Sequence, residues 1–227
     1  MAKLVQKSGY IKSGKASGYM RYIATREGVE KLAGNGAVTK GQRELIQKLL
    51  TDFPDAVELF EYEDYCKTPT LGTASAFISM ALDANFHEMD SESGYMQYIA
   101  TRPRVQKRGA HGLFSSATAV DLTSAMSELE AHEGNVWTII YSLRREDAAR
   151  LEYNNADAWR ALLMENAPTL AKSMKISLDN FHWCAAFHDE GHHPHIHMMV
   201  WSDDPKEGFL TKDGIAAMRS KLTNAIF

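Results

Sequence analysis

Hydrophobic and polar side chains alternate along two stretches near the end of the chain, residues 181–188 and 195–201. Neighbouring side chains on a strand point to opposite faces of its sheet, so each stretch predicts a strand with one apolar face and one histidine-bearing face. Residues 136–143 are almost continuously apolar and predict a buried strand. Residues 3–11 are expected to form the first strand of the same sheet.

Apolar residues at helical spacing predict the helices. The expected helices cover residues 39–50, 73–82 and 121–130, a segment from 155 or 156 onward, and the end of the chain from 211. Pro168 is expected to interrupt or kink the fourth of these. The order of elements predicts an α+β fold in two layers, with a central antiparallel sheet of about five strands packed with helices.

A length of 227 residues suits one large domain, alone or with an insertion. We expect one domain over residues 1–227, and the helix-rich block over residues 37–90 is expected to be a helical insertion. The last predicted helix is still running where the sequence stops. The sequence therefore predicts the N-terminal part of a longer polypeptide.

The two histidine-bearing strands are separated only by residues 189–194, which contain a glycine and a proline, as expected of a short hairpin loop. If the hairpin closes with His188 opposite His195, then Ala186 lies opposite His197. The imidazoles of these three histidines then converge on one face, and the small Ala186 side chain leaves room for an ion.

Three neutral imidazoles with open coordination positions are typical of a catalytic metal site. Residue type alone does not select among divalent ions. We expect Mn²⁺ or Mg²⁺, with Zn²⁺ as an alternative. Glu190 is expected to accept a hydrogen bond from a ring N–H and so orient a metal ligand. His192 and His193 lie in the loop and are interpreted as bystanders, whereas His111 and His182 are expected to be packing or surface groups.

Composition places the chain among ordinary globular proteins, with 44% hydrophobic and 24% charged residues. No apolar run approaches the length of a membrane span, and the first residues do not resemble a signal peptide. We therefore expect a cytoplasmic protein without a membrane partner. Cys66 and Cys184 give no disulfide framework and are expected to be buried small hydrophobic residues.

The net charge of −4 does not by itself indicate nucleic-acid binding. Positive residues nevertheless gather locally. Arg102 belongs to one such cluster, and Arg144 and Arg145 belong to another. A local patch is enough for phosphate contact, because charges interact only over about 8 Å at physiological salt.

A tyrosine-rich decapeptide occurs twice, at residues 17–26 and at residues 93–102, with one difference between the copies. Each copy contains the segment Tyr-Ile-Ala-Thr-Arg, which begins at Tyr22 in the first copy and at Tyr98 in the second. Exposed tyrosines are plausible covalent nucleophiles. A phenol beside a histidine cluster indicates metal-assisted cleavage of a nucleic-acid strand.

These motifs resemble those of the HUH-type relaxases of conjugative plasmids and integrative elements, within the MobP branch. The family's histidine motif runs His-x-Asp, a short loop and Pro-His-x-His, and residues 188–197 read His-Asp-Glu-Gly-His-His-Pro-His-Ile-His with the same spacing between the outer histidines. Glu190 stands where the family commonly has Asp. The resemblance covers most of the chain and implies the HUH-type fold.

The resemblance also implies a mechanism. A tyrosine attacks the scissile phosphate and forms a 5′-phosphotyrosyl DNA intermediate with a free 3′-hydroxyl, with the metal held by His188, His195 and His197. Tyr98 is favoured slightly as the nucleophile, because its interval to the histidine motif is that of simpler relatives, and Tyr22 is kept as the alternative. Tyr19 and Tyr95, one helical turn earlier, are third choices, and each is more plausibly an aromatic anchor.

The implied substrate is single-stranded or hairpin DNA at an origin of transfer, nicked at one site on one strand. Accessory relaxosome and coupling proteins are possible partners. Arg26 and Arg102 each lie four residues beyond a candidate tyrosine and are expected to hold a phosphate. Arg144 and Arg145 are expected to contact the DNA backbone elsewhere.

Three other interpretations remain open from the sequence. The run from His193 to Met199 also fits the pattern of histidine-triad nucleotide hydrolases, in which a histidine is the nucleophile and no metal is needed. A replication-initiator nickase of the HUH class is harder to separate from a relaxase. The third interpretation is a DNA-binding module that keeps the fold without turnover.

Overall fold

The computed structural model describes residues 3–10, 35–85, 96, 99–100, 105–107, 109–117, 120–189 and 193–227. The chain divides into two compact units, of which the first combines residues 1–11 with residues 91–227 and the second covers residues 12–90. Each unit is described by itself. No helix in these described ranges is both long enough and apolar enough to cross a membrane.

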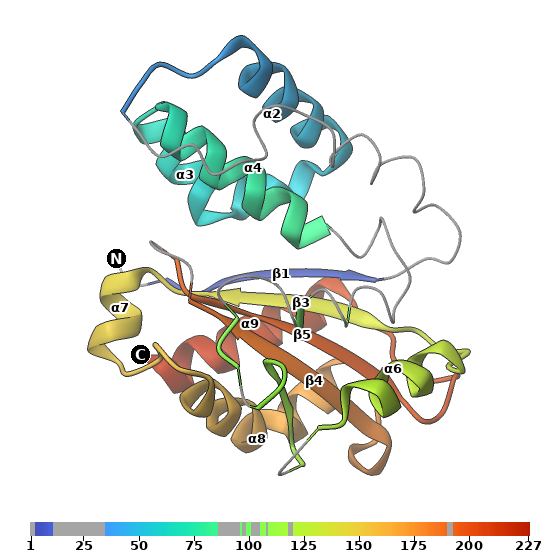
Figure 1. Cartoon of the computed structure of the whole chain (residues 1–227). Helices are drawn as coiled ribbons and strands as arrows, with labels where there is room; N and C mark the ends of the chain where they lie inside the picture. Colours follow the sequence, from blue (N-terminus) through green and yellow to red (C-terminus); the bar gives the residue numbers. More distant parts are fainter. Residues whose placement is uncertain are drawn as a thin grey trace. The chain divides into compact units, whose positions relative to one another are not determined.

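The first unit is built on a five-stranded antiparallel sheet, as the sequence predicts (Figure 1). Its spatial order is β1-β3-β5-β4-β2. The strands are β1 (Val5–Tyr10), β2 (Leu113–Ser115), β3 (Trp137–Ser142), β4 (Phe181–His188) and β5 (His195–Ser202). The edge strand β2 was not predicted, whereas the other four lie within or close to the expected ranges. The α+β fold class is therefore confirmed, and the arrangement is consistent with an HUH-type fold.

Two long helices, α8 (Ala156–Ser173) and α9 (Lys212–Ile226), cover one face of this sheet (Figure 1). Trp159 of α8 is fully buried in the core that they form with the apolar face of the central strands. Both helices begin as predicted, with the Asn155 and Thr211 side chains capping their first backbone N–H groups. We call this the helix-covered face, and the opposite side the histidine face.

Pro168 lies inside α8 and does not interrupt it, since the helix continues to Ser173. A proline within a helix removes one backbone N–H, here the one that would bond to the carbonyl of Met164. Met164 is among the exposed residues, so water can solvate that carbonyl. The remaining bonds carry the helix past the proline.

The described part of the first unit also contains two shorter helices. The helix α6 (Leu122–Glu130) is capped by Asp121, as predicted. Leu129 is its one buried residue. The helix α7 (Arg145–Arg150), which directly follows β3, was not predicted. A short 3₁₀ turn (Leu178–Asn180) leads into β4.

The second unit contains the helices α2 (Lys40–Asp52), α3 (Phe60–Lys67) and α4 (Leu71–Asn85), with a 3₁₀ turn (Pro54–Glu58) between α2 and α3. Thr39 and Gln42 form a reciprocal capping box at the start of α2, which fixes this predicted helix boundary. The block predicted to be an insertion, residues 37–90, falls within this unit. Its origin as an insertion stays a prediction.

Candidate metal centre

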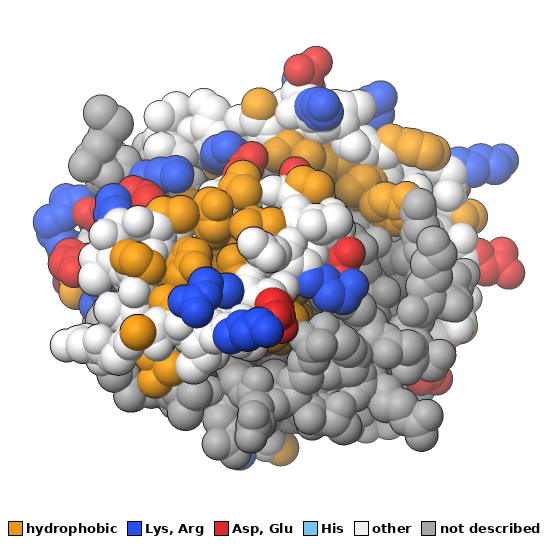
Figure 2. All heavy atoms as spheres, turned by 90° about the horizontal axis from the view of Figure 1, so that it is seen from above, with side chains coloured by type: hydrophobic (Ala, Val, Ile, Leu, Met, Phe, Trp, Pro, Cys, Tyr) orange, Lys and Arg blue, Asp and Glu red, His pale blue; other side chains and the backbone are white. Residues whose placement is uncertain are grey.

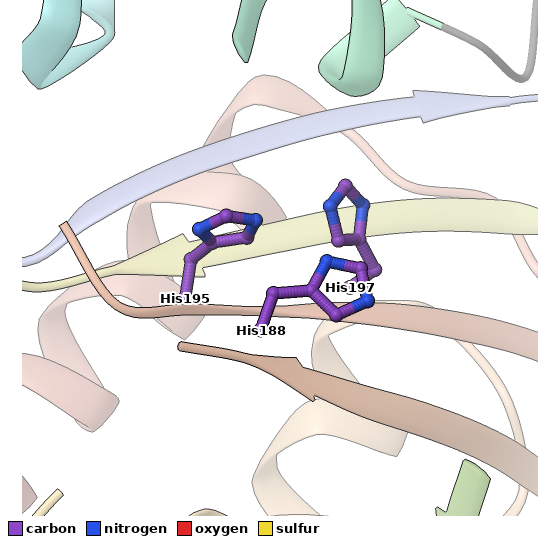
Figure 3. Close-up of side chains that lie close together, drawn as sticks. All are labelled: His188, His195 and His197. Atoms are coloured by element: carbon purple, nitrogen blue, oxygen red, sulfur yellow. The ribbon is translucent and has the colours of Figure 1, made fainter. Parts of the chain in front are cut away.

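The three histidines of the hairpin converge on the histidine face of the sheet (Figure 3). The register pairs His188 with His195 and Ala186 with His197, which confirms the predicted hairpin. Ring centroids are 4.7 Å apart for His188 and His197, 5.0 Å for His195 and His197, and 5.2 Å for His188 and His195. One ring nitrogen from each residue lies within 4.8 Å of the others, and all three side chains are fully buried.

Main-chain carbonyl groups orient two of these rings. The Nε2 atom of His188 lies 2.9 Å from the carbonyl oxygen of Ile99, and the Nδ1 atom of His195 lies 3.0 Å from the carbonyl oxygen of His193. A carbonyl oxygen can only accept a hydrogen bond, so each of these nitrogens donates its proton. In the neutral rings the lone pair then lies on Nδ1 of His188 and on Nε2 of His195, which is the form that a metal ligand takes.

The sequence around the hairpin explains why the rings can come so close. Two of the residues paired with these histidines are small: Ala186 pairs with His197, and Ser142 of β3 pairs with His195. The hairpin is also tied to β3, because the backbone N–H of Leu143 donates to the carbonyl of Pro194 at 3.2 Å. Three buried imidazoles, two of them oriented by backbone carbonyls, fit a divalent first-row metal ion.

The end of the second tyrosine-rich repeat packs at the same place. Met96, Ile99 and Ala100 are helical and fully buried. The chain that follows pairs with the end of β4, where Val105 forms an isolated bridge with His188. The repeat and the chain that follows it therefore contact the candidate metal ligand His188 in two ways. The Ile99 carbonyl accepts a hydrogen bond from the His188 ring, and Val105 pairs with the His188 backbone.

Gly112 contacts the last described residue of the repeat, Ala100. Its backbone N–H donates to the carbonyl of Ala100 at 2.8 Å, which joins the repeat to the start of β2. A Cβ atom at this position would lie 2.1 Å from Cγ2 of Val105 and 3.1 Å from the carbonyl oxygen of Gln106. No side chain fits there, so a glycine is required.

Arg145, predicted to contact DNA, lies beside the histidine hairpin. Its guanidinium is 2.6 Å from the carboxylate of Asp189, the residue after His188. About one third of the Arg145 side chain is exposed (33%). Arg144 precedes it at the start of α7 and is half-buried. The structure therefore brings Arg145 close to the three histidines through Asp189.

Several predicted site residues lie outside the described residues. They are Tyr22, Tyr98, Glu190, Arg26 and Arg102, together with the third-choice tyrosines Tyr19 and Tyr95. Their proposed roles stay predictions.

Two of the smaller expectations need correction. His193 is not a bystander, because it is buried and its carbonyl orients His195. Cys66 is exposed rather than buried, whereas Cys184 is buried as expected. Neither the Ile99 carbonyl nor the His193 carbonyl was anticipated, since a backbone contact leaves no mark on residue type.

His182 belongs to a separate group at the other end of β4. Its Nε2 atom is 2.7 Å from a carboxylate oxygen of Asp203, and its ring stacks on Trp201. Glu128 accepts a hydrogen bond from the indole of Trp201 at 2.9 Å, and its carboxylate approaches the same pair. Glu128, His182 and Asp203 are half-buried or exposed, in agreement with the surface role expected of His182.

Charges on the face of the molecule shown in Figure 2 are mixed, with Lys and Arg side chains interspersed among Asp and Glu. On that face, the described residues form no single basic surface of the kind that binds duplex DNA without sequence preference. This distribution agrees with the net charge of −4.

Comparison with known protein families identifies the family of this chain. The model of the family described as MobL relaxases matches residues 1–227, the whole chain. No curated protein matches. No solved structure matches either.

Proposed function

The chain belongs to the MobL relaxase family, whose members nick DNA at an origin of transfer during DNA mobilization, and from this premise we propose how its residues do so. It acts as an HUH-type relaxase of the MobP kind. A divalent ion bound by His188, His195 and His197 and a tyrosine nucleophile cleave one strand at one site. Family membership favours this interpretation over a histidine-triad hydrolase, a replication initiator or a module without turnover.

The observation that carries the proposal is the convergence of three buried imidazoles, with ligand nitrogens within 4.8 Å of one another. Two of these rings have the tautomer of a metal ligand set by backbone carbonyls. The ion, for which we propose Mn²⁺ or Mg²⁺ with Zn²⁺ as the alternative, would supply Lewis-acid polarisation of the scissile phosphate when bound. The histidine face would orient that phosphate and exclude water from it.

Tyr98 is proposed as the nucleophile, with Tyr22 as the alternative. The support is the position of its neighbour, since Ile99 bonds through its carbonyl to His188. The phenolic oxygen would form a bond to phosphorus while the bond from phosphorus to the 3′-oxygen breaks. The phenol gives up its proton, the 3′-oxygen gains one, and the 5′-phosphotyrosyl link conserves the energy needed to rejoin the strand.

The remaining predicted residues have proposed supporting roles. Arg26 or Arg102 would hold a phosphate near the tyrosine, and Arg144 and Arg145 would contact the backbone further along the strand. Glu190 would accept a hydrogen bond from the ring N–H of a metal ligand and so orient that ring. The substrate would be single-stranded or hairpin DNA, with accessory relaxosome and coupling proteins as possible partners.

The decisive experiment is to map the DNA-linked residue. The purified chain is incubated with Mn²⁺ and a single-stranded oligonucleotide that spans the nick site of its origin of transfer, here called the nick-site oligonucleotide. The covalent product is then digested and sequenced by mass spectrometry. We expect the adduct on Tyr98, its loss in Tyr98→Phe, and its retention in the matched variant Tyr22→Phe.

The outcomes separate the parts of the proposal. An adduct on Tyr22 that survives Tyr98→Phe would reject the assignment of the nucleophile but keep the tyrosine mechanism. An adduct on a histidine, or cleavage without any adduct, would reject the mechanism itself. Adduct formation that persists unchanged in excess EDTA would reject the role of the metal.

A further inference from the structure

The strands of the described sheet carry one permanently charged side chain, Lys7 of β1. Every other strand residue is an apolar residue, an uncharged polar residue, a glycine or a histidine. Lys7 is only 9% exposed. A lysine is rarely buried to this extent unless its ammonium group has polar or charged partners, because removing an ammonium group from water is costly.

Lys7 lies on the histidine face, in the same row as a candidate metal ligand. The register pairs Lys7 with Ile140, and Ile140 with His197. Residues that pair directly in an antiparallel sheet point to the same side. With strands about 4.8 Å apart, the Cα atoms of Lys7 and His197 are separated by two strand spacings, or about 10 Å. The buried side chain of Ile140 lies between them.

This placement has an electrostatic consequence. Lys7 and a divalent ion at His197 would be two positive centres on one water-poor face, and they would repel each other more strongly than in water. An anion bound between or alongside them removes that repulsion. A DNA strand supplies one negative charge at every nucleotide, so a strand with its scissile phosphate at the histidines places a neighbouring phosphate near Lys7.

We infer that Lys7 is a phosphate-binding residue for the nicked strand, and that it holds a phosphate next to the scissile one. The inference rests on the proposed function in one respect, which is that the histidine face receives the scissile phosphate. Lys7 would fix the position of the strand along the row Lys7–Ile140–His197, with Ile140 as the apolar floor beneath it. A lysine ammonium suits this contact because it binds phosphate as a compact point charge.

The test measures binding without cleavage. Affinity of the metal-free chain for the nick-site oligonucleotide is measured by fluorescence anisotropy in EDTA at several salt concentrations. We expect Lys7→Met to bind about tenfold more weakly. The slope of log affinity against log salt should also fall by about 0.7, the change for one lost phosphate contact on a single strand. Lys7→Arg keeps the charge and should keep the wild-type slope.

Lys3→Met is the matched control, since Lys3 precedes the same strand but is exposed. It should leave the affinity and the slope almost unchanged. If Lys7→Met binds with the affinity and slope of Lys3→Met, the inference is wrong. Because no cleavage is needed, this result is independent of the nucleophile and the metal. Wild-type adduct formation reports on those separately.

A second measurement uses the wild-type chain and so covers the case in which Lys7→Met does not fold. The nick-site oligonucleotide carries a 2′-linked aldehyde on the sugar next to the nick phosphate. A nearby lysine amine condenses with the aldehyde with loss of water, and cyanoborohydride supplies the hydride that reduces the imine. Peptide mapping should find the crosslink on Lys7. A crosslink confined to other lysines would overturn the inference.

Discussion

The Nε2 atom of His188 donates a hydrogen bond of 2.9 Å to the main-chain carbonyl of Ile99, the residue that follows Tyr98 in the sequence. A candidate metal ligand and the backbone of the second repeat are thus held together by one bond. The bond sets the tautomer of the ring and also the position of the helical segment around Ile99. Any change that rotates the His188 ring should therefore disturb both the metal centre and the repeat.

Metal binding should depend on the three buried histidines. We expect the wild-type chain to bind Mn²⁺ in a protein-bound form visible by electron paramagnetic resonance, and His197→Ala to weaken that binding by more than about tenfold, because one of three ligands is lost. His182→Ala is the matched control, since His182 lies on the same face of β4 but belongs to the exposed group with Asp203. Equal Mn²⁺ affinity in both variants would contradict the site.

Arg145 should respond to the loss of its carboxylate partner. Asp189 occupies the Arg145 guanidinium at 2.6 Å and competes with any phosphate for it. We expect Asp189→Asn to raise the affinity for single-stranded DNA by about two- to fivefold, the range of a partly exposed ion pair, and Arg145→Ala to lower it. Arg150→Ala, which breaks a pair with Asp147 in the same helix, serves as the control and should change little. An unchanged affinity for Arg145→Ala would show that Arg145 does not contact DNA.

The two cysteines should differ sharply in reactivity. Burial raises the pKa of the Cys184 thiol to about 12, with the nearby Glu128 carboxylate adding to the effect. Only the thiolate reacts with iodoacetamide, so Cys184 should stay unlabelled at about pH 8. The exposed Cys66 should be labelled in the folded chain. Labelling is read by mass spectrometry, and Cys66→Ser should take up no label until guanidinium chloride unfolds the protein.

Glu207 should stabilise the fold in a pH-dependent way. Its carboxylate accepts a hydrogen bond of 2.6 Å from the Ser202 hydroxyl, and further bonds from Asn180 and Ser177. These bonds lower the pKa of Glu207 below its usual value, the Ser202 bond most strongly. A lowered pKa stabilises the folded state above the unfolded value of about 4.3, and this contribution is lost as the pH falls through the folded pKa.

The measurement for Glu207 is urea unfolding over a range of pH. Glu207→Gln should be less stable than the wild type near neutrality, and the difference should shrink as the solution becomes acidic. Glu130→Gln, a change at an exposed glutamate of α6, provides the comparison. A difference that does not vary with pH would mean that the charge of Glu207 plays no part.

The histidine hairpin was predictable because two independent constraints agree. Strand alternation places His195 and His197 on one face, and the short loop from Asp189 to Pro194 allows few ways of closing the hairpin. The observed pairing of His188 with His195 follows from both. Helix boundaries at Thr39, Asn155 and Thr211 were predictable for a similar reason, since a capping side chain coincides with the start of an apolar stripe.

The features that could not be predicted from the sequence are either very short or formed by backbone atoms. The strand Leu113–Ser115 is too short to show alternation, and it forms because it pairs with β4. The Ile99 carbonyl could hold His188 whatever its side chain, so the sequence could not reveal it. Gly112 was the one available signal, since a glycine before a short apolar run marks a close backbone approach.

Position within the sheet gives the three histidines unequal protection. His197 lies within β5, whereas His188 is the last residue of β4 and His195 is the first residue of β5, so both border the hairpin loop. Local opening near that loop would release His188 and His195 and leave the His197 ring in place. Amide hydrogen exchange should therefore be slow along the centre of β5, including His197, and faster at His188 and His195, so that the ion could enter or leave when the loop end of the hairpin opens.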